Sequence, residues 1–446
     1  MLLIKNGFVV DPANNIARKA TVIVKDGRIV RVTDAESREG SCEETDAERF
    51  ENGCEETGAE RFEGGCKVID AEGCIVAPGL VDVHVHFRDP GFTHKEDIET
   101  GARAALKGGF TGVVLMANTK PAVDNPDTLT YVIEKGRTTD LKIYTCANVT
   151  KGMAGRELTD MELLRQKGAA GFTDDGIPIM DAALLEQAMR RASALGVPIS
   201  LHEENPALII NNGVNQGKAS EHFGIGGSPR EAEISLIERD LELALRTDVI
   251  LNIQHISTKE GVALVREAKC RGAKIHAEAT PHHFSLTEDA VIAHGALAKM
   301  NPPLREEADR LAIIEGLKDG TIDLIATDHA PHGREEKARP LTEAPSGIIG
   351  LETALSLGIT NLVDTGALTI SELIAHMTVN PARMYRLDAG TLSVGAPADL
   401  VIFDANATQT VGNYASKSAN SPFTGQRLKG VVRCTIVDGK VVYEGK

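Results

Sequence analysis

The chain has 446 residues, a length that suits one large catalytic domain together with a smaller one. Its formal net charge of −16 repels nucleic acid, and no Lys/Arg cluster is interleaved with aromatic residues, so a nucleic-acid partner is not expected. No run of about 18 apolar residues occurs, so no membrane-spanning helix is expected. The start, MLLIKNGFVVDP, indicates a strand and a turn rather than a signal peptide. We therefore expect the seven cysteines to be reduced thiols of a cytoplasmic protein.

The first part of the chain contains three strand-like stretches, at residues 2–10, 21–32 and 67–76. Before the third stretch lies a duplicated segment, in which CEETDAERFEN (42–52) is followed by CEETGAERFEG (54–64). This segment is acidic and poor in branched apolar residues, so we expect a mobile surface insertion at about 38–66. Its cysteines lack the CxxC spacing of zinc sites, which disfavours a metal-binding role for the repeat.

The middle of the chain, residues 77–387, alternates strand-like and helical patterns, with the helical period clearest at 181–195 and 230–246. The strands are expected at residues 80–87, 112–116, 141–147, 170–173, 197–202, 249–255, 274–279 and 322–327. Eight successive βα units favour an α/β fold with a closed (β/α)8 barrel of the TIM type over an open sheet. Functional sites of such barrels lie at the carboxyl ends of the strands, so polar residues should gather there.

The last part of the chain returns to short strands, at residues 400–403, 430–437 and 440–443. Between the last two, Asp438-Gly439 predicts a tight hairpin turn. We expect the two chain ends, residues 1–76 and 388–446, to form one small β-sandwich domain that the barrel interrupts.

Side chains of the metal-binding type follow five of the predicted barrel strands. The first strand ends in Asp82-Val-His84-Val-His86-Phe-Arg88, and residues i and i+2 of a strand point the same way, about 6–7 Å apart. The other four ends carry Asp174 and Asp175, His202, His255, and Asp328 with His329 and His332. A single histidine at a strand end is more often structural, and Asp-Asp-Gly is often only a turn. Five strand ends with the same residue types indicate a shared site.

Imidazole and carboxylate ligands suit a borderline cation such as zinc, although cobalt and manganese accept them too. Four histidines and two carboxylates exceed the needs of one tetrahedral zinc. Two ions that share a bridging carboxylate would use all six groups, and such ions lie about 3.5–4 Å apart. Spacing alone leaves open whether Asp174 or Asp175 is the bridge.

These segments resemble the amidohydrolase superfamily and, within it, the dihydroorotases. The resemblance spans nearly the whole barrel and is carried by GLVDVHVHFRDPG (79–91), MANTKP (116–121), GFTDDG (171–176), HEEN (202–205), HISTKE (255–260), EATPHHFSLTED (278–289), KMNPPLR (299–305), IATDHAPHGREEK (325–337) and APSGIIGLETA (344–354). It implies a zinc-dependent hydrolase of a cyclic amide. The reaction implied is the reversible conversion of dihydroorotate and water to N-carbamoyl-aspartate in pyrimidine biosynthesis.

The resemblance also implies a ligand set for two zinc ions per chain. His84, His86 and Asp328 would bind the first ion, and His202 and His255 the second. It favours Asp175 over Asp174 as the bridging carboxylate. Many relatives, including hydantoinases and allantoinases, bridge their metals with a carboxylated lysine at this strand, and residues 173–175 here contain no lysine.

For the substrate, the resemblance implies that Arg88 and Asn118 bind the carboxylate. The other contacts implied are His86, Asn301, His332, Ser346 and Gly347, with Asn301 on the ring. Arg offers a fork of donors that matches a carboxylate. Asp328 would act as both metal ligand and general acid/base. Whether residues 344–352 close over the substrate stays open, although Pro345 and Gly347 would suit a mobile lid.

Two alternatives remain to be weighed against this interpretation. One is a hydantoinase or allantoinase type of cyclic amidase, which the missing lysine and the pair Arg88 and Asn118 disfavour. The other is an inactive, dihydroorotase-like subunit that scaffolds a partner such as aspartate transcarbamoylase. Inactive relatives should have lost metal ligands, and this chain retains every expected one. A scaffolding role alongside activity stays open, as does the oligomeric state.

Overall fold

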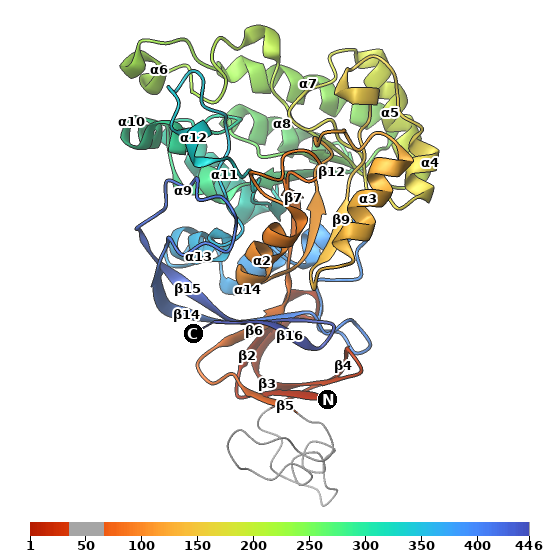
Figure 1. The fold of residues 1–446 in the computed structure, drawn as a ribbon, viewed down its shortest axis with the longest axis vertical. Coiled ribbons are helices and arrows are strands. Elements are labelled where there is room, and N and C mark those ends of the chain that lie inside the picture. The colour runs from red at the N-terminus through yellow and green to blue at the C-terminus, as the bar shows by residue number, and fades with distance from the viewer. Residues whose placement is uncertain (35–66, 446) are drawn as a thin grey trace, which may run out of the picture.

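The computed structural model describes residues 1–34 and 67–445, and the predicted acidic repeat lies outside these ranges. Two regions stack along the long axis of the molecule (Figure 1). The upper region is a barrel of strands surrounded by helices, and the lower one is a curled sheet to which both chain ends contribute. The architecture expected from the sequence, an α/β barrel with a β-domain built from the two ends, is therefore confirmed.

The barrel closes through two parallel sheets and the bridges between them. Phe172 bridges Ala147 on one side and Ile199 on the other, and Val85 bridges His329 to complete the ring. The fourth predicted strand, at 170–173, is thus reduced to the bridges at Phe172. The barrel strands are β7 (Leu80–Val85), β8 (Phe110–Leu115), β9 (Lys142–Thr145), β10 (Ile199–Leu201), β11 (Leu251–Ile253), β12 (Ile275–Ala279) and β13 (Leu324–Ile325).

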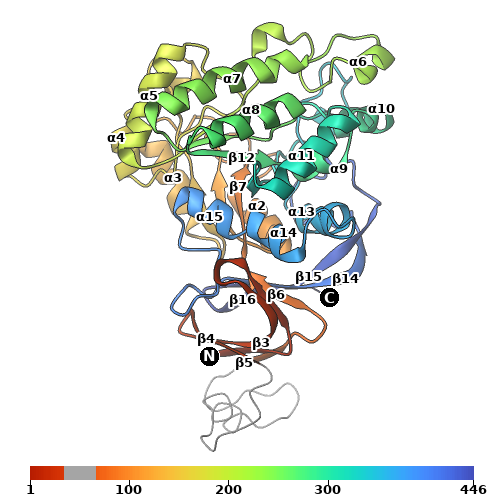
Figure 2. The ribbon, with the colours of Figure 1, turned by 180° about the vertical axis from the view of Figure 1, so that it is seen from behind.

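The helices surround the barrel (Figure 2). Their buried apolar side chains belong to the core of the barrel. In α5, Leu185, Ala188, Met189 and Ala192 are buried at helical spacing, and Asp181 caps the first turn. The helices are α2 (Ile98–Lys107), α3 (Pro126–Gly136), α4 (Met161–Gln166), α5 (Ala182–Leu195), α6 (Lys218–Phe223), α7 (Arg230–Thr247), α8 (Lys259–Cys270), α9 (Pro281–Ser285), α10 (Asp289–His294), α11 (Glu307–Asp319), α12 (Arg334–Lys337), α13 (Ala354–Gly358), α14 (Ile370–His376) and α15 (Val379–Tyr385).

Shorter helical turns complete the connections. They are η1 (Pro12–Asn14), η2 (Lys151–Met153), η3 (Pro206–Leu208), η4 (Gly295–Ala298) and the π-turn η5 (Ile359–Val363). Both helices predicted from periodicity, α5 and α7, begin and end within one residue of the expected positions. Across the described residues, no helix combines the length and apolar character that crossing a bilayer requires.

The lower sheet joins the two chain ends through β6, which pairs with β2 in parallel and with β14 in antiparallel orientation. The predicted hairpin is present, because Asp438 and Gly439 both adopt positive φ between β15 and β16. The strands of this sheet are β1 (Leu2–Lys5), β2 (Phe8–Asp11), β3 (Ile16–Lys25), β4 (Arg28–Asp34), β5 (Lys67–Asp70), β6 (Ile75–Pro78), β14 (Leu400–Thr410), β15 (Arg427–Val437) and β16 (Lys440–Glu444).

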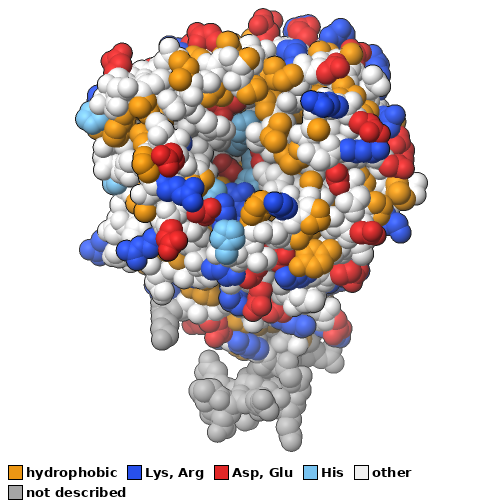
Figure 3. Space-filling model, turned by 45° about the horizontal axis from the view of Figure 1, so that its top comes forward, with side chains coloured by type: hydrophobic (Ala, Val, Ile, Leu, Met, Phe, Trp, Pro, Cys, Tyr) orange, Lys and Arg blue, Asp and Glu red, His pale blue; other side chains and the backbone are white. Residues whose placement is uncertain are grey.

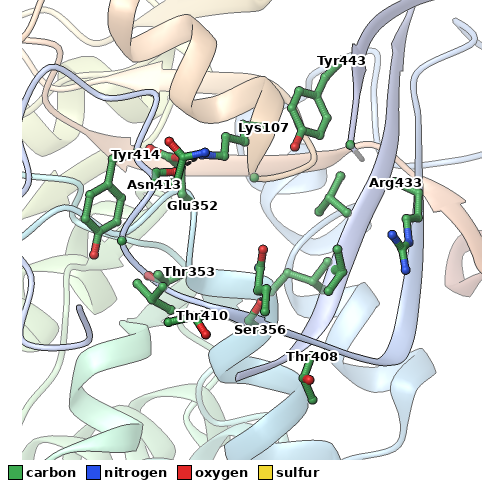
Figure 4. Close-up of a pocket in the computed structure, with 18 residues that line it drawn as sticks. Lys107, Glu352, Thr353, Ser356, Thr408, Thr410, Asn413, Tyr414, Arg433 and Tyr443 are labelled. Atoms are coloured by element: carbon green, nitrogen blue, oxygen red, sulfur yellow. Dashed lines mark hydrogen bonds and ion pairs between the residues drawn. The ribbon is translucent and has the colours of Figure 1, made fainter. Parts of the chain in front are cut away.

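Alternate residues of the curled sheet face two cores. Leu400 and Ile402 belong to the core enclosed by the sheet, whereas Val401 and Phe403 join the core of the barrel. A cavity of about 340 Å³, which we call the junction cavity, lies where the sheet meets the barrel (Figure 4). Lys107 in its lining pairs with Glu352 at 2.8 Å.

Candidate metal centre

A cavity of about 350 Å³ opens at the carboxyl ends of the barrel strands. From above, it is a hollow in which histidine and acidic side chains are visible (Figure 3). Its lining includes side chains from the segments that follow β7, β8, β10, β11 and β13. The lining residues expected from the sequence are His86, Arg88, Asn118, Asp175, His202, His255, Asn301, Asp328, His332, Ser346 and Gly347.

His84 and His86 are presented by the end of β7 and converge on two carboxylates. The Nδ1 of His84 lies 2.9 Å from Glu278 Oε2, which leaves its Nε2 facing Asp175 and Asp328, each with an oxygen at 3.5 Å. The Nε2 of His86 lies 3.0 Å from Asp328 Oδ1. The i and i+2 spacing therefore brings both rings to one point, as predicted.

The two adjacent aspartates after Phe172 have different surroundings. Asp174 is buried and accepts hydrogen bonds from the backbone N–H groups of Val149 and Thr150 and from the Asn148 side chain. Asp175 instead lies among the histidines. Its oxygens are 3.5 Å from His84 and from His86, 3.8 Å from His202 and 4.0 Å from His255. Of the two aspartates, Asp175 alone faces the cluster of histidines.

His202 and His255 extend the cluster from the ends of β10 and β11. Their facing nitrogen atoms, Nδ1 of His202 and Nε2 of His255, are 2.9 Å apart. The other nitrogen of His202 lies 3.1 Å from Glu204 Oε2, which fixes the orientation of the ring. Both rings thus direct one nitrogen towards Asp175.

Three residues of the site adopt backbone conformations that are uncommon for side-chain-bearing residues. The φ angles are 59° at Arg88, 31° at His255 and 47° at Asp328. Such conformations cost on the order of 1–3 kcal/mol each and persist only where the surrounding structure enforces them. They turn these three side chains out of their strands and into the cavity.

The residues fit a metal centre on grounds of the structure itself. Two groups, His84 with His86 and Asp328, and His84 with Asp175 and His255, each place three ligand atoms within 4.8 Å of one another. His84 Nε2 and Asp175 Oδ1 are buried and lack any hydrogen-bond partner. His84 Nδ1 gives its hydrogen to Glu278, so Nε2 and Asp175 Oδ1 both present lone pairs, and a cation bound between them would account for both.

The charges of the cluster favour the same conclusion. Burial opposes ionisation of Asp175, but the imidazoles of His84, His86 and His202 lower its pKa, so this carboxylate is charged at neutral pH. Burial opposes a proton on His84, yet Glu278 and Asp175 raise its pKa. Burial, with His202 and His84 nearby, lowers the pKa of His255 and keeps that ring neutral, as a metal ligand must be.

The residues expected to contact the substrate surround the metal cluster. Arg88 is half-buried, with Nε donating to Pro331 O at 3.3 Å. Asn118 accepts from His86 Nδ1 at 2.9 Å and donates to Asp175 Oδ2 at 3.0 Å, so it links two of the expected ligands. Asn301 Nδ2 lies 3.3 Å from His202 Nε2.

The remaining expected contacts, His332, Ser346 and Gly347, form one wall of the cavity. His332 Nε2 lies 2.8 Å from Ser346 O. Gly347 has φ of 118°, and a Cβ there would lie 2.6 Å from the Cβ of Ala330, so only glycine fits.

Sequence reasoning missed the residues that hold the ligands in place. Glu278 orients His84 and also accepts from Asn252 Nδ2 at 2.6 Å, and Glu204 orients His202. Lys299 lines the cavity and was assigned no role. The signal available was the position of Glu278 at the end of the seventh strand, where a buried carboxylate faces the same site.

Comparisons with known proteins identify the family of the chain. A model of the amidohydrolase family matches residues 75–442. The chain is 49% identical over 448 residues to dihydroorotase from Clostridium acetobutylicum, covering 100% of both chains. It is 50% identical over 443 residues to dihydroorotase from Clostridioides difficile, covering 99% of this chain and 100% of the relative.

Solved structures share the fold. L-hydantoinase from Arthrobacter aurescens gives a TM-score of 0.84 at 26% identity, covering 99% of this chain and 96% of the other. D-hydantoinase from Thermus sp. gives a TM-score of 0.81 at 25% identity, covering 100% of this chain and 95% of the other. From the family match and the full-length identities, the chain belongs to the amidohydrolase family and, within it, to the dihydroorotases, metal-dependent hydrolases of a cyclic amide.

Proposed function

We propose that the cluster binds two zinc ions and that the enzyme interconverts (S)-dihydroorotate and N-carbamoyl-L-aspartate for pyrimidine biosynthesis. His84, His86 and Asp328 would hold one ion, His202 and His255 would hold the other, and Asp175 would be shared between them. The observation that supports this assignment is the position of Asp175, whose carboxylate lies within 4.0 Å of all four histidines. Asp174 is not proposed as the bridge, because it already accepts hydrogen bonds from Asn148, Val149 and Thr150.

Asp328 carries the proton in the proposed mechanism. When bound, zinc would supply a water whose pKa is lowered towards about 7 and a Lewis acid for a carbonyl oxygen. Asp328 accepts the proton that the attacking water loses and delivers it to the ring nitrogen as the amide C–N bond breaks. In the synthetic direction, Asp328 takes the proton from the carbamoyl nitrogen as that nitrogen closes the ring, and water leaves. Its position 3.0 Å from His86, in a left-handed backbone conformation, suits this double role.

Recognition of the substrate carboxylate falls to the walls of the cavity. The guanidinium of Arg88 offers paired donors to a carboxylate. Asn118 lines the same cavity and donates a hydrogen bond to Asp175. Asn301, next to His202, is placed to contact the ring. His332, Ser346 and Gly347 are the further contacts proposed from the same lining, and His332 Nε2 lies 3.4 Å from Arg88 Nη2.

The competing substrates are hydantoin and allantoin, because solved structures of hydantoinases share this fold. The bridging position argues against them. Residues 173–175 are Thr-Asp-Asp, without the lysine that those enzymes use as a bridge. The described residues place Asp175, and no lysine, against the four histidines.

The test is an assay of zinc-loaded protein with L-dihydroorotate, hydantoin and allantoin in parallel, followed by ultraviolet absorbance. We expect turnover of dihydroorotate alone, loss of activity after chelation and recovery after zinc is restored. Turnover of hydantoin or allantoin instead would overturn the proposed substrate while keeping the metal centre. A fully metal-loaded protein that acts on none of them would favour a scaffold that requires a partner.

We place the enzyme in the cytoplasm, since Cys74, Cys146, Cys270 and Cys434 are all free thiols. A complex with aspartate transcarbamoylase is proposed on the family resemblance alone. Co-elution of the two proteins in size-exclusion chromatography tests it, and separate elution at micromolar concentrations of both would contradict it.

A further inference from the structure

One wall of the active-site cavity is held by two buried lysines, Lys337 behind it and Lys299 in the lining of the cavity itself. The wall, which we call the 341–347 loop, includes Ser346 and Gly347. Lys299 Nζ donates to Leu341 O and Ala344 O, both at 2.8 Å. Lys337 Nζ donates to Pro345 O and Gly347 O, both at 2.9 Å. The backbone of the loop is therefore fixed, which argues against the mobile lid that its proline and glycine suggested.

Neither ammonium group is neutralised by a carboxylate in the described part of the chain. Their side chains are only 4% and 6% exposed. Burial lowers the pKa of Lys299, and burial together with the charge of Lys299 lowers the pKa of Lys337 to about 7. Neutral donors would hold a loop without burying unpaired charge, as Asn420 does with Gly347 O at 3.0 Å. With a pKa of about 7, Lys337 is protonated in only part of the molecules at neutral pH, and an anion bound on the other side of the loop would favour its protonated form.

The hydrogen bonds of the loop show how the charge reaches the cavity. Three carbonyl oxygens of the loop accept hydrogen bonds from side chains. Lys299 donates to Ala344 O, Lys337 donates to Pro345 O, and His332 donates to Ser346 O. A trans peptide places its N–H opposite its C=O. Because Lys337 holds Pro345 C=O, the N–H of Ser346 points away from Lys337, and the described residues supply no acceptor for it. Ser346 lines the cavity and Lys337 does not.

Lys95 supports this arrangement from a second side. Lys95 Nζ lies 3.3 Å from His332 Nδ1 and pairs with Glu336 at 2.9 Å. An ammonium can only donate, so Nδ1 of His332 accepts and Nε2 carries the hydrogen given to Ser346 O. His332 is therefore tied to the loop and uses its one N–H there.

We propose that Lys337, supported by Lys299, is a positioning residue for the substrate carboxylate. Its ammonium fixes and polarises the Pro345–Ser346 peptide so that the Ser346 N–H serves as a carboxylate donor in the cavity. The inference rests on the proposed function and adds to it a residue that does not touch the substrate. It commits to an anionic ligand, since a neutral ring gains nothing from this charge.

The test compares binding of orotate with binding of its neutral methyl ester, each measured by titration calorimetry on zinc-loaded protein. Lys337→Met keeps the length of the side chain and removes the charge. We expect orotate affinity to fall about tenfold, with methyl orotate affinity changed by less than about twofold. With dihydroorotate as substrate, KM should rise by a similar factor while kcat stays within about threefold.

Lys318→Met, at an exposed lysine of α11, is the matched control for loss of one positive charge and should change neither affinity. Lys299→Met should reproduce the loss for orotate in a second protein. Two results would overturn the inference and leave the proposed function intact, provided that the variants keep their zinc and thermal stability. One is an equal loss of affinity for orotate and methyl orotate. The other is unchanged affinity for both in Lys337→Met or in Lys299→Met. A wild-type protein that turns over hydantoin and binds neither probe would overturn the proposed substrate, and the inference with it.

Discussion

The two cavities of this molecule have nearly equal volumes, about 350 Å³ at the carboxyl ends of the barrel strands and about 340 Å³ at the junction with the terminal sheet. Their chemistry differs. The first contains buried polar atoms without partners and residues in strained backbone conformations. In the junction cavity Lys107 pairs with Glu352, and Arg433 lies 3.6 Å from Asp404. Unsatisfied groups, rather than volume, identify the functional site.

The largest expected effect on activity is that of replacing Asp328, in the cavity at the carboxyl ends of the barrel strands. Asp328→Asn keeps the side-chain shape, and asparagine tolerates the left-handed φ of 47°, so the fold should survive. Loss of the proton carrier should lower kcat by at least on the order of 10²–10⁴-fold. Steady-state kinetics and thermal denaturation check both expectations. Substantial remaining activity in a folded, zinc-loaded variant would refute the acid/base role.

A smaller loss of zinc affinity or activity is expected on replacing Glu278, the carboxylate that orients the expected metal ligand His84. Glu278→Gln should weaken the hold on His84 and reduce zinc affinity or activity by about 10–100-fold. The matched control is Asp323→Asn, because Asp323 lies 2.5 Å from His276, on the same strand β12 but away from the cluster. Competition with a zinc chelator measures both variants. Equal zinc affinities in the two would show that Glu278 has no special part.

A third effect concerns stability and pH. The pKa of Lys337 is about 7 in the folded protein, against about 10.5 ordinarily, so the unfolded chain binds more protons between these values. The free energy of unfolding should therefore rise with pH across this window, by on the order of 2–4 kcal/mol for this group. Lys337→Met should lack that slope. Thermal denaturation from pH 7 to 10 checks it, and a constant difference from wild type would contradict it.

The smallest effect is expected at the junction cavity. Lys107→Met removes the ion pair with Glu352, which is partly exposed to solvent on the lysine side. We expect a loss of at most about 1 kcal/mol in unfolding free energy and kcat/KM within about twofold of wild type. Chemical denaturation and steady-state kinetics measure the two quantities. A large loss of activity in a stable variant would mean that the junction cavity participates in function.

The sequence was sufficient to predict the barrel and the gathering of histidines and aspartates at its rim because both follow from short-range patterns. His84 and His86 share a face of β7 by the strand period, and the ends of parallel strands meet at one rim. The hairpin at Asp438 and Gly439 follows from turn chemistry. The fourth strand was overestimated, because only the bridges at Phe172 form there.

Contacts between distant segments were not predictable in the same way. Glu278 meets His84 across 194 positions of the chain, and no local period indicates such a partner. Asp174 and Asp175 are adjacent and chemically identical. Their surroundings differ because the Asn148 side chain and the Val149 N–H donate hydrogen bonds to Asp174. The hold of Lys299 and Lys337 on the 341–347 loop likewise appears only in the folded chain.

The central claim, that Asp175 joins four histidines into a site for two metal ions, is tested most directly by counting metal. Purified protein and its Asp175→Ala and Asp174→Ala variants would be dialysed against the same zinc buffer and measured by inductively coupled plasma mass spectrometry. We predict two zinc ions per chain in the wild type and in Asp174→Ala, provided the latter is folded, and at most one in Asp175→Ala. Two ions per chain in folded Asp175→Ala would contradict the assignment.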